Sequence, residues 1–116
     1  MTKGPERLQV RSRIWIDRDG RAFLGGGRVA LLERIASTGS ISQAARELGI
    51  SYRKAWGMVE AMERAAEEPL VERDSGGRGG GGTRLTPYGR RAVKVFRQME
   101  QQCRDRVDEL MEQARL

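Results

Sequence analysis

The chain has 116 residues, a length that fits one compact domain with a short extension, and its 38% hydrophobic and 33% charged residues are typical of a soluble globular protein. Cys103 is the only cysteine and histidine is absent, which excludes an internal disulfide, a Cys/His zinc site and a histidine base, so we expect no metal, no cofactor and no enzymatic activity. No apolar stretch approaches the roughly 18 residues of a membrane span, and the N-terminus lacks a signal peptide's apolar core, so we expect a cytoplasmic protein without a membrane partner.

The formal net charge is +6, which suits a polyanionic partner. Residues 73–97 alone carry the same excess, because seven arginines and lysines in this segment are offset only by Asp74. Such a segment either binds nucleic acid or forms a solvated basic face, and the charge by itself leaves both interpretations open.

Residues 1–24 are the first predicted unit, a strand that continues into a β-hairpin. Glycine at the end of the segment 17–20 suits a turn, and residues 22–24 return as the second strand. The first strand is predicted because apolar side chains alternate with polar neighbours, a period of two, at Leu8, Val10, Ile14 and Ile16.

Two helices follow the glycines of residues 25–27, which break the strand pattern. Apolar residues recur at helical spacing from Arg28 until Gly39, a residue suited to a helix end. Ser42 is then expected to cap a second helix of about two turns, which Gly49 closes because glycine readily adopts the left-handed conformation.

A third helix is predicted after Ser51, whose hydroxyl can cap it, and Ala55, Val59 and Met62 form its inward stripe. Beyond it, residues 70–73 and 83–86 predict two short strands around a glycine-rich tip. This tip is not a phosphate-binding loop, because neither a lysine nor a helix follows the glycines.

The last predicted helix begins after Thr86, a capping residue, with Pro87 at its first position. Its apolar stripe continues for about seven turns, longer than a small domain can cover, so we expect a partner helix and a homodimer. The residues predicted to make the dimer contact are Phe96, Met99, Cys103, Val107 and Leu110.

The order of three helices and a hairpin with a basic tip predicts a mainly α-helical fold with a small β component, the winged helix-turn-helix. We expect the hairpin unit at 1–24, the winged helix-turn-helix domain at 25–90 and a C-terminal dimerisation helix at 86–116. In this fold the third helix enters the major groove of double-stranded DNA.

The start of the third helix offers hydroxyl, cationic and aromatic side chains to DNA, beginning with Ser51. Arg53 and Tyr52 are the candidates for reading bases, because arginine pairs bidentately with guanine, and Lys54 is the candidate for gripping phosphate. Trp56 has two interpretations, packing against the hairpin or the second helix, and contact with a sugar or a thymine methyl group.

Further contacts with DNA are expected outside the third helix. Ser42 and Gln43 can donate hydrogen bonds to a phosphate at the start of the second helix, although Ser42 could equally be only a cap. In the hairpin, Arg78 can reach a groove or a phosphate from the glycine-rich tip, and Arg73 and Arg84 lie at its base.

Five short segments form a recognisable set, namely residues 39–45, 49–56, 70–73, 76–82 and 85–89. The two most specific parts are Ser-Tyr-x-x-Ala-Trp and the glycine run Gly-Gly-x-Gly-Gly-Gly-Gly. Together the segments resemble the DNA-binding domain of ModE-type molybdate-responsive regulators, and more loosely the headpiece of LysR-type regulators, over about Leu24 to Phe96.

This resemblance implies a bacterial transcription regulator that dimerises through its N-terminal region and long last helix and presents two recognition helices to a pseudo-palindromic site. Molybdate-sensing members carry further C-terminal oxyanion-binding domains, whereas this sequence stops at Leu116. We therefore expect no molybdate or other small-molecule effector within this chain, which is a stand-alone regulator, a protein with a separate sensor, or a fragment. The alternative function is a protein-interaction or adaptor module with weak DNA binding, which Trp56, Tyr52 and the long helix would suit.

Overall fold

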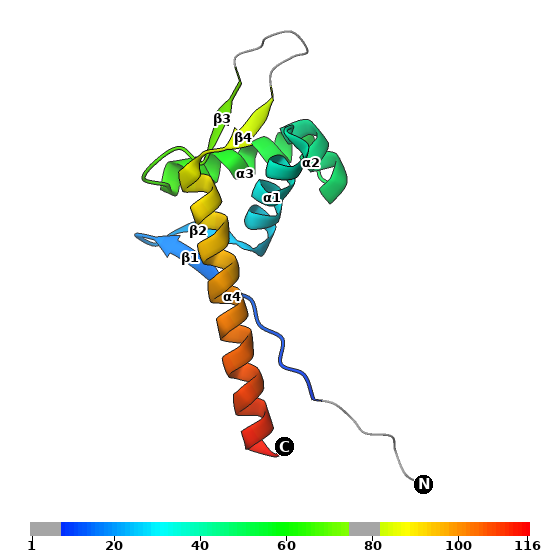
Figure 1. Ribbon diagram of the computed structural model, residues 1–116, viewed down its shortest axis with the longest axis vertical. Helices are drawn as coiled ribbons and strands as arrows, with labels where there is room; N and C mark the ends of the chain where they lie inside the picture. Colours follow the sequence, from blue (N-terminus) through cyan, green and yellow to red (C-terminus); the bar gives the residue numbers. More distant parts are fainter. Residues whose placement is uncertain (1–7, 75–81) are drawn as a thin grey trace.

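The computed structural model describes residues 8–74 and 82–116, and within them three helices form a body from which a hairpin and one long helix project in different directions (Figure 1). Two separate two-stranded antiparallel sheets flank the helices. The elements in chain order are β1 (Trp15–Arg18), β2 (Arg21–Gly25), α1 (Gly26–Thr38), α2 (Ile41–Leu48), α3 (Tyr52–Ala65), β3 (Val71–Arg73), β4 (Thr83–Leu85) and α4 (Pro87–Ala114).

The predicted N-terminal hairpin is present, with Asp19 and Gly20 as its two-residue turn. Both residues have positive φ, 49° and 79°, which matches the right-handed twist of the flanking strands. The first strand begins at Trp15 rather than at Leu8, which is 56% exposed. The reason is the register, because Trp15 pairs with Gly25, the last residue of β2, and earlier residues have no strand to pair with.

We expected the glycines of residues 25–27 to lie between the strand and the helix. Instead Gly25 is the last residue of β2, and α1 begins directly at Gly26. A side chain at Gly25 would collide with the Trp15 indole, since a Cβ atom there would lie 2.9 Å from its Cδ1. The predicted end of the helix is confirmed: Gly39 has φ 73° and its N–H bonds to the carbonyl of Ile35.

The caps of the next two helices are partly as predicted. Gly49 ends α2 with φ 69°, and the hydroxyl of Ser51 caps α3 by accepting a hydrogen bond from the Lys54 N–H at 3.0 Å. The cap of α2 is Ser40, which accepts from the Gln43 N–H at 3.0 Å, whereas Ser42 lies in the first turn. The prediction of Ser42 as the cap was wrong by two residues, because Ser40 already has the extended backbone that a cap requires.

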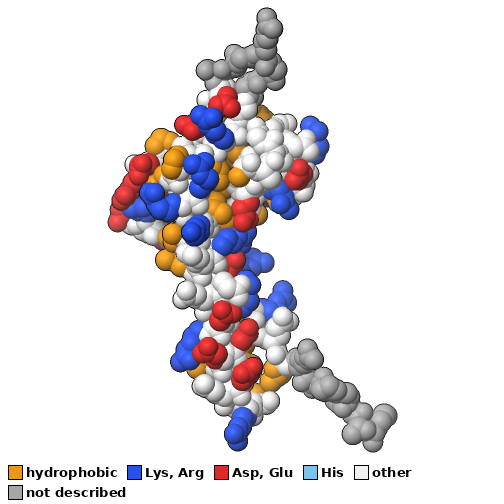
Figure 2. All heavy atoms as spheres, in the orientation of Figure 1, with side chains coloured by type: hydrophobic (Ala, Val, Ile, Leu, Met, Phe, Trp, Pro, Cys, Tyr) orange, Lys and Arg blue, Asp and Glu red, His pale blue; other side chains and the backbone are white. Residues whose placement is uncertain are grey.

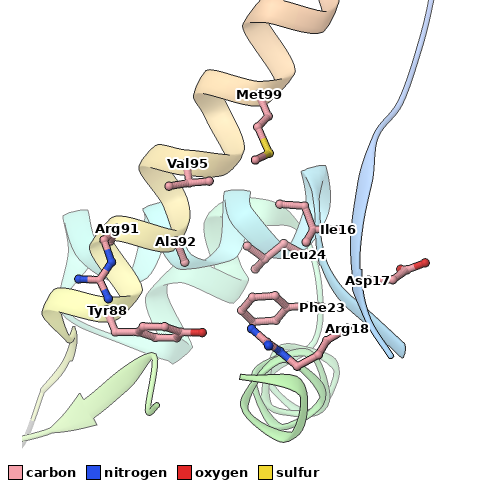
Figure 3. A pocket seen from close by; sticks show the side chains of 10 residues that line it. All are labelled: Ile16, Asp17, Arg18, Phe23, Leu24, Tyr88, Arg91, Ala92, Val95 and Met99. Carbon is pink, nitrogen blue, oxygen red and sulfur yellow. The ribbon is translucent and has the colours of Figure 1, made fainter. Parts of the chain in front are cut away.

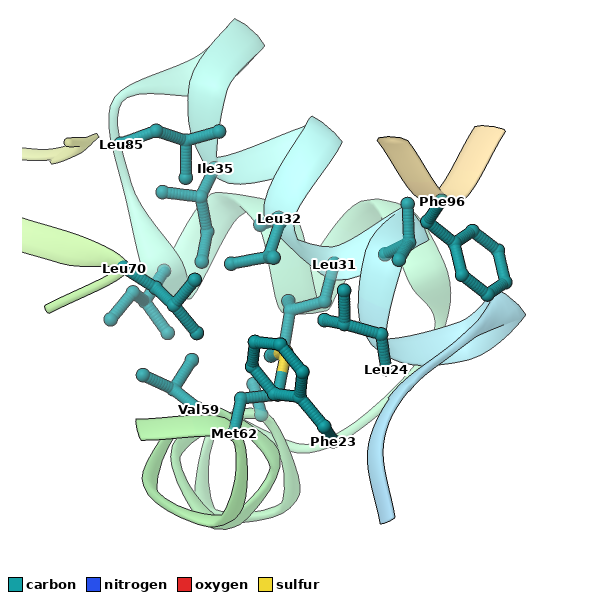
Figure 4. Close-up of a cluster of buried hydrophobic side chains, with 14 of the residues drawn as sticks. Phe23, Leu24, Leu31, Leu32, Ile35, Val59, Met62, Leu70, Leu85 and Phe96 are labelled. Atoms are coloured by element: carbon teal, nitrogen blue, oxygen red, sulfur yellow. The ribbon is translucent and has the colours of Figure 1, made fainter. Parts of the chain in front are cut away.

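The hydrophobic core lies between α1, α2 and α3 and is closed by residues from the strands and from α4 (Figure 4). Ala55, Val59 and Met62 of α3 are buried in it, as predicted. Phe96 is also buried there, with 0% of its surface exposed. This corrects the assignment of Phe96 to the dimer contact, because a side chain enclosed by its own chain has no surface to offer a partner.

The second hairpin, β3 and β4, is anchored to the body at both strands. The Glu63 carboxylate at the end of α3 accepts hydrogen bonds from the Leu70 N–H at 2.8 Å and the Val71 N–H at 3.1 Å. From β4, the Thr83 N–H donates to the carbonyl of Gly39 at 2.8 Å, next to the start of α2. The base of the hairpin therefore has a fixed position relative to α2 and α3.

Helix α4 begins at the Thr86 cap with Pro87 in its first turn, as predicted, and it is fixed to α1 by Arg97. Two nitrogens of the Arg97 guanidinium donate hydrogen bonds to the Glu33 carboxylate, at 2.6 Å and 3.2 Å, and the third nitrogen donates to Glu100. The hydrogen bond to Glu33 is the main cause of an Arg97 pKa above its usual value. Beyond this contact α4 leaves the body (Figure 1). In residues 8–74 and 82–116, no helix is long and apolar enough to cross a membrane.

Candidate nucleic-acid interface

The start of α3 presents polar and cationic side chains to solvent. Ser51, Tyr52, Arg53 and Lys54 are all exposed, while Ala55 turns into the core. In the described part of the chain neither Arg53 nor Lys54 has a carboxylate within 4.0 Å. Within the described residues these two cations are therefore not neutralised and can bind an anion.

A pocket with predominantly polar lining opens where α2, α3 and the second hairpin meet, and we call it the polar pocket. Ser42 and Tyr52 lie at it together with Arg73, so three residues singled out from the sequence converge there. Gln43 lies outside it, and its amide oxygen accepts a bond from Arg46 at 3.3 Å. The lining consists of Gly39, Ser40, Ile41, Ser42, Tyr52, Arg73, Asp74, Gly82 and Thr83.

Donors surround the polar pocket. The N–H groups of Ile41 and Ser42 belong to the first turn of α2, where no intrahelical acceptor exists. Thr83, at 7% exposure, is a buried polar residue of its wall. Two residues of the pocket, Ser40 and Thr83, were not predicted from the sequence. The sequence pattern predicted Ser42 as the cap in place of Ser40, and Thr83 comes close to the start of α2 only because β3 pairs with β4.

Trp56 is half-buried and packs between α3 and the second hairpin, which is the first of the two interpretations that the sequence left open. The guanidinium carbon of Arg73 lies 4.4 Å from the centroid of its indole ring. Tyr52 also contacts Trp56, with the two ring centroids 6.2 Å apart and the rings edge to face. Helix α3 and the second hairpin are thus joined by the contact between Trp56 and Arg73.

The other basic residues of the second hairpin differ from Arg73. Arg84 is already paired, with Glu72 at 2.9 Å and Asp74 at 3.3 Å, and its hydrogen bond to Glu72 is the main reason that its pKa lies above the usual value. Arg78 lies outside the described residues. Arg84 would have to exchange carboxylates for phosphates in order to contact DNA.

The basic segment 73–97 is less free than its sequence suggests. Arg91 and Arg97 are, like Arg84, within 4.0 Å of carboxylates, those of Arg97 belonging to α1 and α4. Figure 2 shows Lys and Arg side chains spread over the body and a group of Asp and Glu on the far half of α4. The cation that lines the polar pocket is Arg73. Arg53 and Lys54, which have no carboxylate within 4.0 Å among the described residues, belong to α3, and the sum over residues 73–97 does not include them.

The remaining predicted dimer residues lie on the part of α4 that leaves the body. Met99 is 49% exposed and Leu110 47%, Cys103 is exposed, and Val107 is half-buried. Val95, at 37% exposure, also belongs to this surface. It was missed because the sequence stripe was placed through Phe96, one position further along the helix.

An apolar groove continues this surface between α4 and the first hairpin (Figure 3). Ala92, Val95 and Met99 form its α4 side, and Ile16 and Phe23 form the hairpin side. This groove is not predictable from the sequence, because its two walls are separated by about 70 residues and only the fold brings them together.

Three helices of which the third exposes cations, followed by a hairpin packed beside that third helix, define the winged helix-turn-helix class of proteins. Residues 27–90 match the model of bacterial regulatory helix-turn-helix proteins of the lysR family. The chain belongs to this family.

Relatives with described functions include proteins named ModE. The chain is 44% identical over 101 residues to the "Molybdenum transport protein ModE" of Azotobacter vinelandii, covering 87% of this chain and 37% of that protein. It is 50% identical over 89 residues to the "Transcriptional regulator ModE" of Yersinia pestis, covering 77% and 34%. The chain therefore spans about a third of the length of these relatives, and the resemblance to ModE-type regulators is confirmed.

A solved structure with the same fold is that of ArgP from Mycobacterium tuberculosis. It superposes with a TM-score of 0.54 at 20% sequence identity and covers 74% of this chain and 30% of that one. The similarity confirms the predicted winged-helix fold.

Proposed function

We propose that this chain binds double-stranded DNA sequence-specifically as a transcription regulator, acting in the cytoplasm. The observation that supports the proposal is the pair of cations at the start of α3, Arg53 and Lys54, which have no carboxylate partner among the described residues. In this arrangement α3 enters the major groove, Arg53 and Tyr52 face base edges, and Lys54 meets a phosphate. Ser42 and Gln43, in the first turn of α2, contact the phosphate backbone of the DNA next to that groove.

Replacement of Arg53 by alanine tests the base-reading role. Fragments selected from a genomic library supply the specific duplex, and a random duplex of equal length is the reference. Because a bidentate contact with guanine contributes about 1–3 kcal/mol of discrimination, Arg53→Ala should lower the ratio of specific to random affinity by roughly 5- to 150-fold. Arg64→Ala, an exposed change near the other end of α3, is the matched control. An equal loss for both duplexes would contradict base reading by Arg53.

A dimer is the second part of the proposal. The exposed surface formed by Met99, Cys103, Val107 and Leu110 continues into the apolar groove, so a second copy of α4 would cover apolar side chains that the body leaves in water. Two recognition helices would then face half-sites about one helical turn apart.

The adaptor function is the outcome that would replace this proposal. If the full chain at low salt bound no genomic fragment more tightly than random DNA, the edge-to-face pair of Tyr52 and Trp56 and the long helix would be surfaces for protein partners.

A further inference from the structure

Arg73 occupies an unusual position for a cation at the base of a hairpin. It pairs across the sheet with Thr83, which is buried, so both side chains leave the hairpin on the side that packs against the body. The neighbouring cross-strand pair, Glu72 and Arg84, leaves on the opposite side and forms its own ion pair at 2.9 Å. Arg73 is thereby separated from Glu72, the carboxylate that precedes it.

The stack on Trp56 takes the place of a carboxylate partner. At 4.4 Å from the ring centroid, the guanidinium carbon is well within the range of a cation–π contact. Among residues 8–74 and 82–116, no carboxylate lies within 4.0 Å of Arg73. A stacked guanidinium uses its face, whereas its five N–H donors lie in its plane. The contact therefore orients Arg73 without consuming its donors or its charge.

Arg73 belongs to the lining of the polar pocket. It lines the pocket together with Tyr52 and with Ile41 and Ser42 of the first turn of α2, so residues that carry a guanidinium, free helix N–H groups and hydroxyls meet around one space. Asp74 also lines the pocket and would repel an anion, but its carboxylate is held by Arg84 at 3.3 Å. The complement of such a donor set is a group with several acceptor oxygens and negative charge.

We propose that the polar pocket seats one backbone phosphate of DNA, with Arg73 as its ligand and Trp56 as the positioning residue that holds Arg73 in place. This inference rests on the proposed function and adds a specific contact to it. A flexible arginine must lose side-chain freedom when it binds a phosphate. Stacking removes that freedom beforehand, and it also ties the hairpin to the recognition helix at the point where both approach the same DNA strand.

The salt dependence of binding to a random duplex tests Arg73 directly, because a phosphate contact does not depend on sequence. Each neutralised phosphate contributes about −0.9 to the slope of log K against log [salt], so Arg73→Gln should flatten the slope by about one unit. Lys94→Gln, an exposed cation of α4 remote from the pocket lining, should leave the slope unchanged. An unchanged slope in Arg73→Gln would overturn the inference, while failure of the unaltered chain to bind the duplex at low salt would overturn the proposed function instead.

A double-mutant cycle tests Trp56. Trp56→Leu should weaken binding by roughly 2- to 5-fold, the range expected from loss of an exposed cation–π contact, with little change of slope because the charge remains. In the presence of Arg73→Gln, Trp56→Leu should have almost no further effect. In the chain that keeps Arg73, Trp56→Tyr should retain most of the affinity that Trp56→Leu loses. Additive effects of the two substitutions in folded protein would show that Trp56 does not act through Arg73 and would overturn its positioning role.

The stack can also be observed in the free protein. Trp15 is 62% exposed on the first hairpin, and Trp15→Phe leaves Trp56 as the only tryptophan. In this background Arg73→Gln should change the emission of Trp56, and Lys94→Gln should not. Identical spectra for all three proteins would mean that Arg73 does not stack in solution, and the inference would fail.

Discussion

The body and the far half of α4 differ in which of their described side chains lack partners, charged ones in the body and apolar ones on α4. In the body, Leu31, Leu32 and Ile35 are completely buried, whereas Arg53 and Lys54 at its surface lack carboxylate partners among the described residues. The far half of α4 differs, since Arg104 and Arg106 pair with glutamates along the helix while Met99 and Leu110 are exposed. A region with a complete core and cations free of carboxylates suits a polyanion, and a region with paired arginines and uncovered apolar side chains suits a protein partner.

The largest expected effect distinguishes the two regions on a single helix. Phe96→Ala removes a fully buried ring, so it should lower the free energy of unfolding by about 3–5 kcal/mol, measured by urea denaturation. Met99→Ala, three residues further, should cost under about 1 kcal/mol at concentrations where the chain is monomeric, because Met99 is half exposed. Equal costs would mean that Phe96 is not part of the body.

A charge on the exposed apolar surface tests the far half of α4. Met99→Glu should weaken the dimer roughly 100-fold, about 2.8 kcal/mol, because the contact would bury an unpaired carboxylate. Sedimentation equilibrium on the full chain measures this change. Lys94→Glu is the control, since five residues correspond to about 140° around the helix. If Met99→Glu dimerised as tightly as the unaltered chain, the partner surface would lie elsewhere.

Glu63 connects α3 to the second hairpin, and its replacement tests how much this connection stabilises the fold. Glu63→Ala leaves the Leu70 and Val71 N–H groups without their charged acceptor, which should cost about 1.5–3 kcal/mol of stability. Glu60→Ala removes only a 3.9 Å surface pair with Arg64 and should cost under about 0.5 kcal/mol. Thermal denaturation of both variants gives the comparison, and similar melting temperatures would show that Glu63 does not anchor the hairpin.

The smallest effect concerns the cap of α2. Ser40→Ala should cost about 1 kcal/mol because it removes the acceptor of the Gln43 N–H. Ser42→Ala should change stability by less than about 0.5 kcal/mol and should act on DNA affinity instead. The reverse order of the two stabilities would restore Ser42 as the cap.

Sequence reasoning succeeded where the physical cause is local. The ends of α1 and α2 at Gly39 and Gly49, and the start of α3 at Ser51, depend on a backbone conformation and one hydrogen bond within a few residues. The order of elements and the family resemblance followed from the same short-range signals. Even so, the choice between Ser40 and Ser42 could not be made reliably, because both are serines at the start of one helix.

Long-range pairing decided what periodicity could not. Helical spacing placed Phe96 and Met99 on one apolar stripe, but only packing against α1 and the first hairpin determines that Phe96 is buried and Met99 is not. The prediction that the first strand extends before Trp15 was wrong for a related reason, since a strand exists only where a partner strand is present.

The sequence by itself determined a winged helix-turn-helix with cations at the start of its third helix, because helix caps, glycine turns and apolar periods act over a few residues. The tertiary structure decided which of the arginines elsewhere in the described chain have carboxylate partners. Arg97 pairs with Glu33, 64 residues away, Arg84 pairs across a sheet, and Arg73 stacks on Trp56. A charge summed along the chain cannot reveal this, because an ion's availability depends on what the fold places within a few ångströms of it.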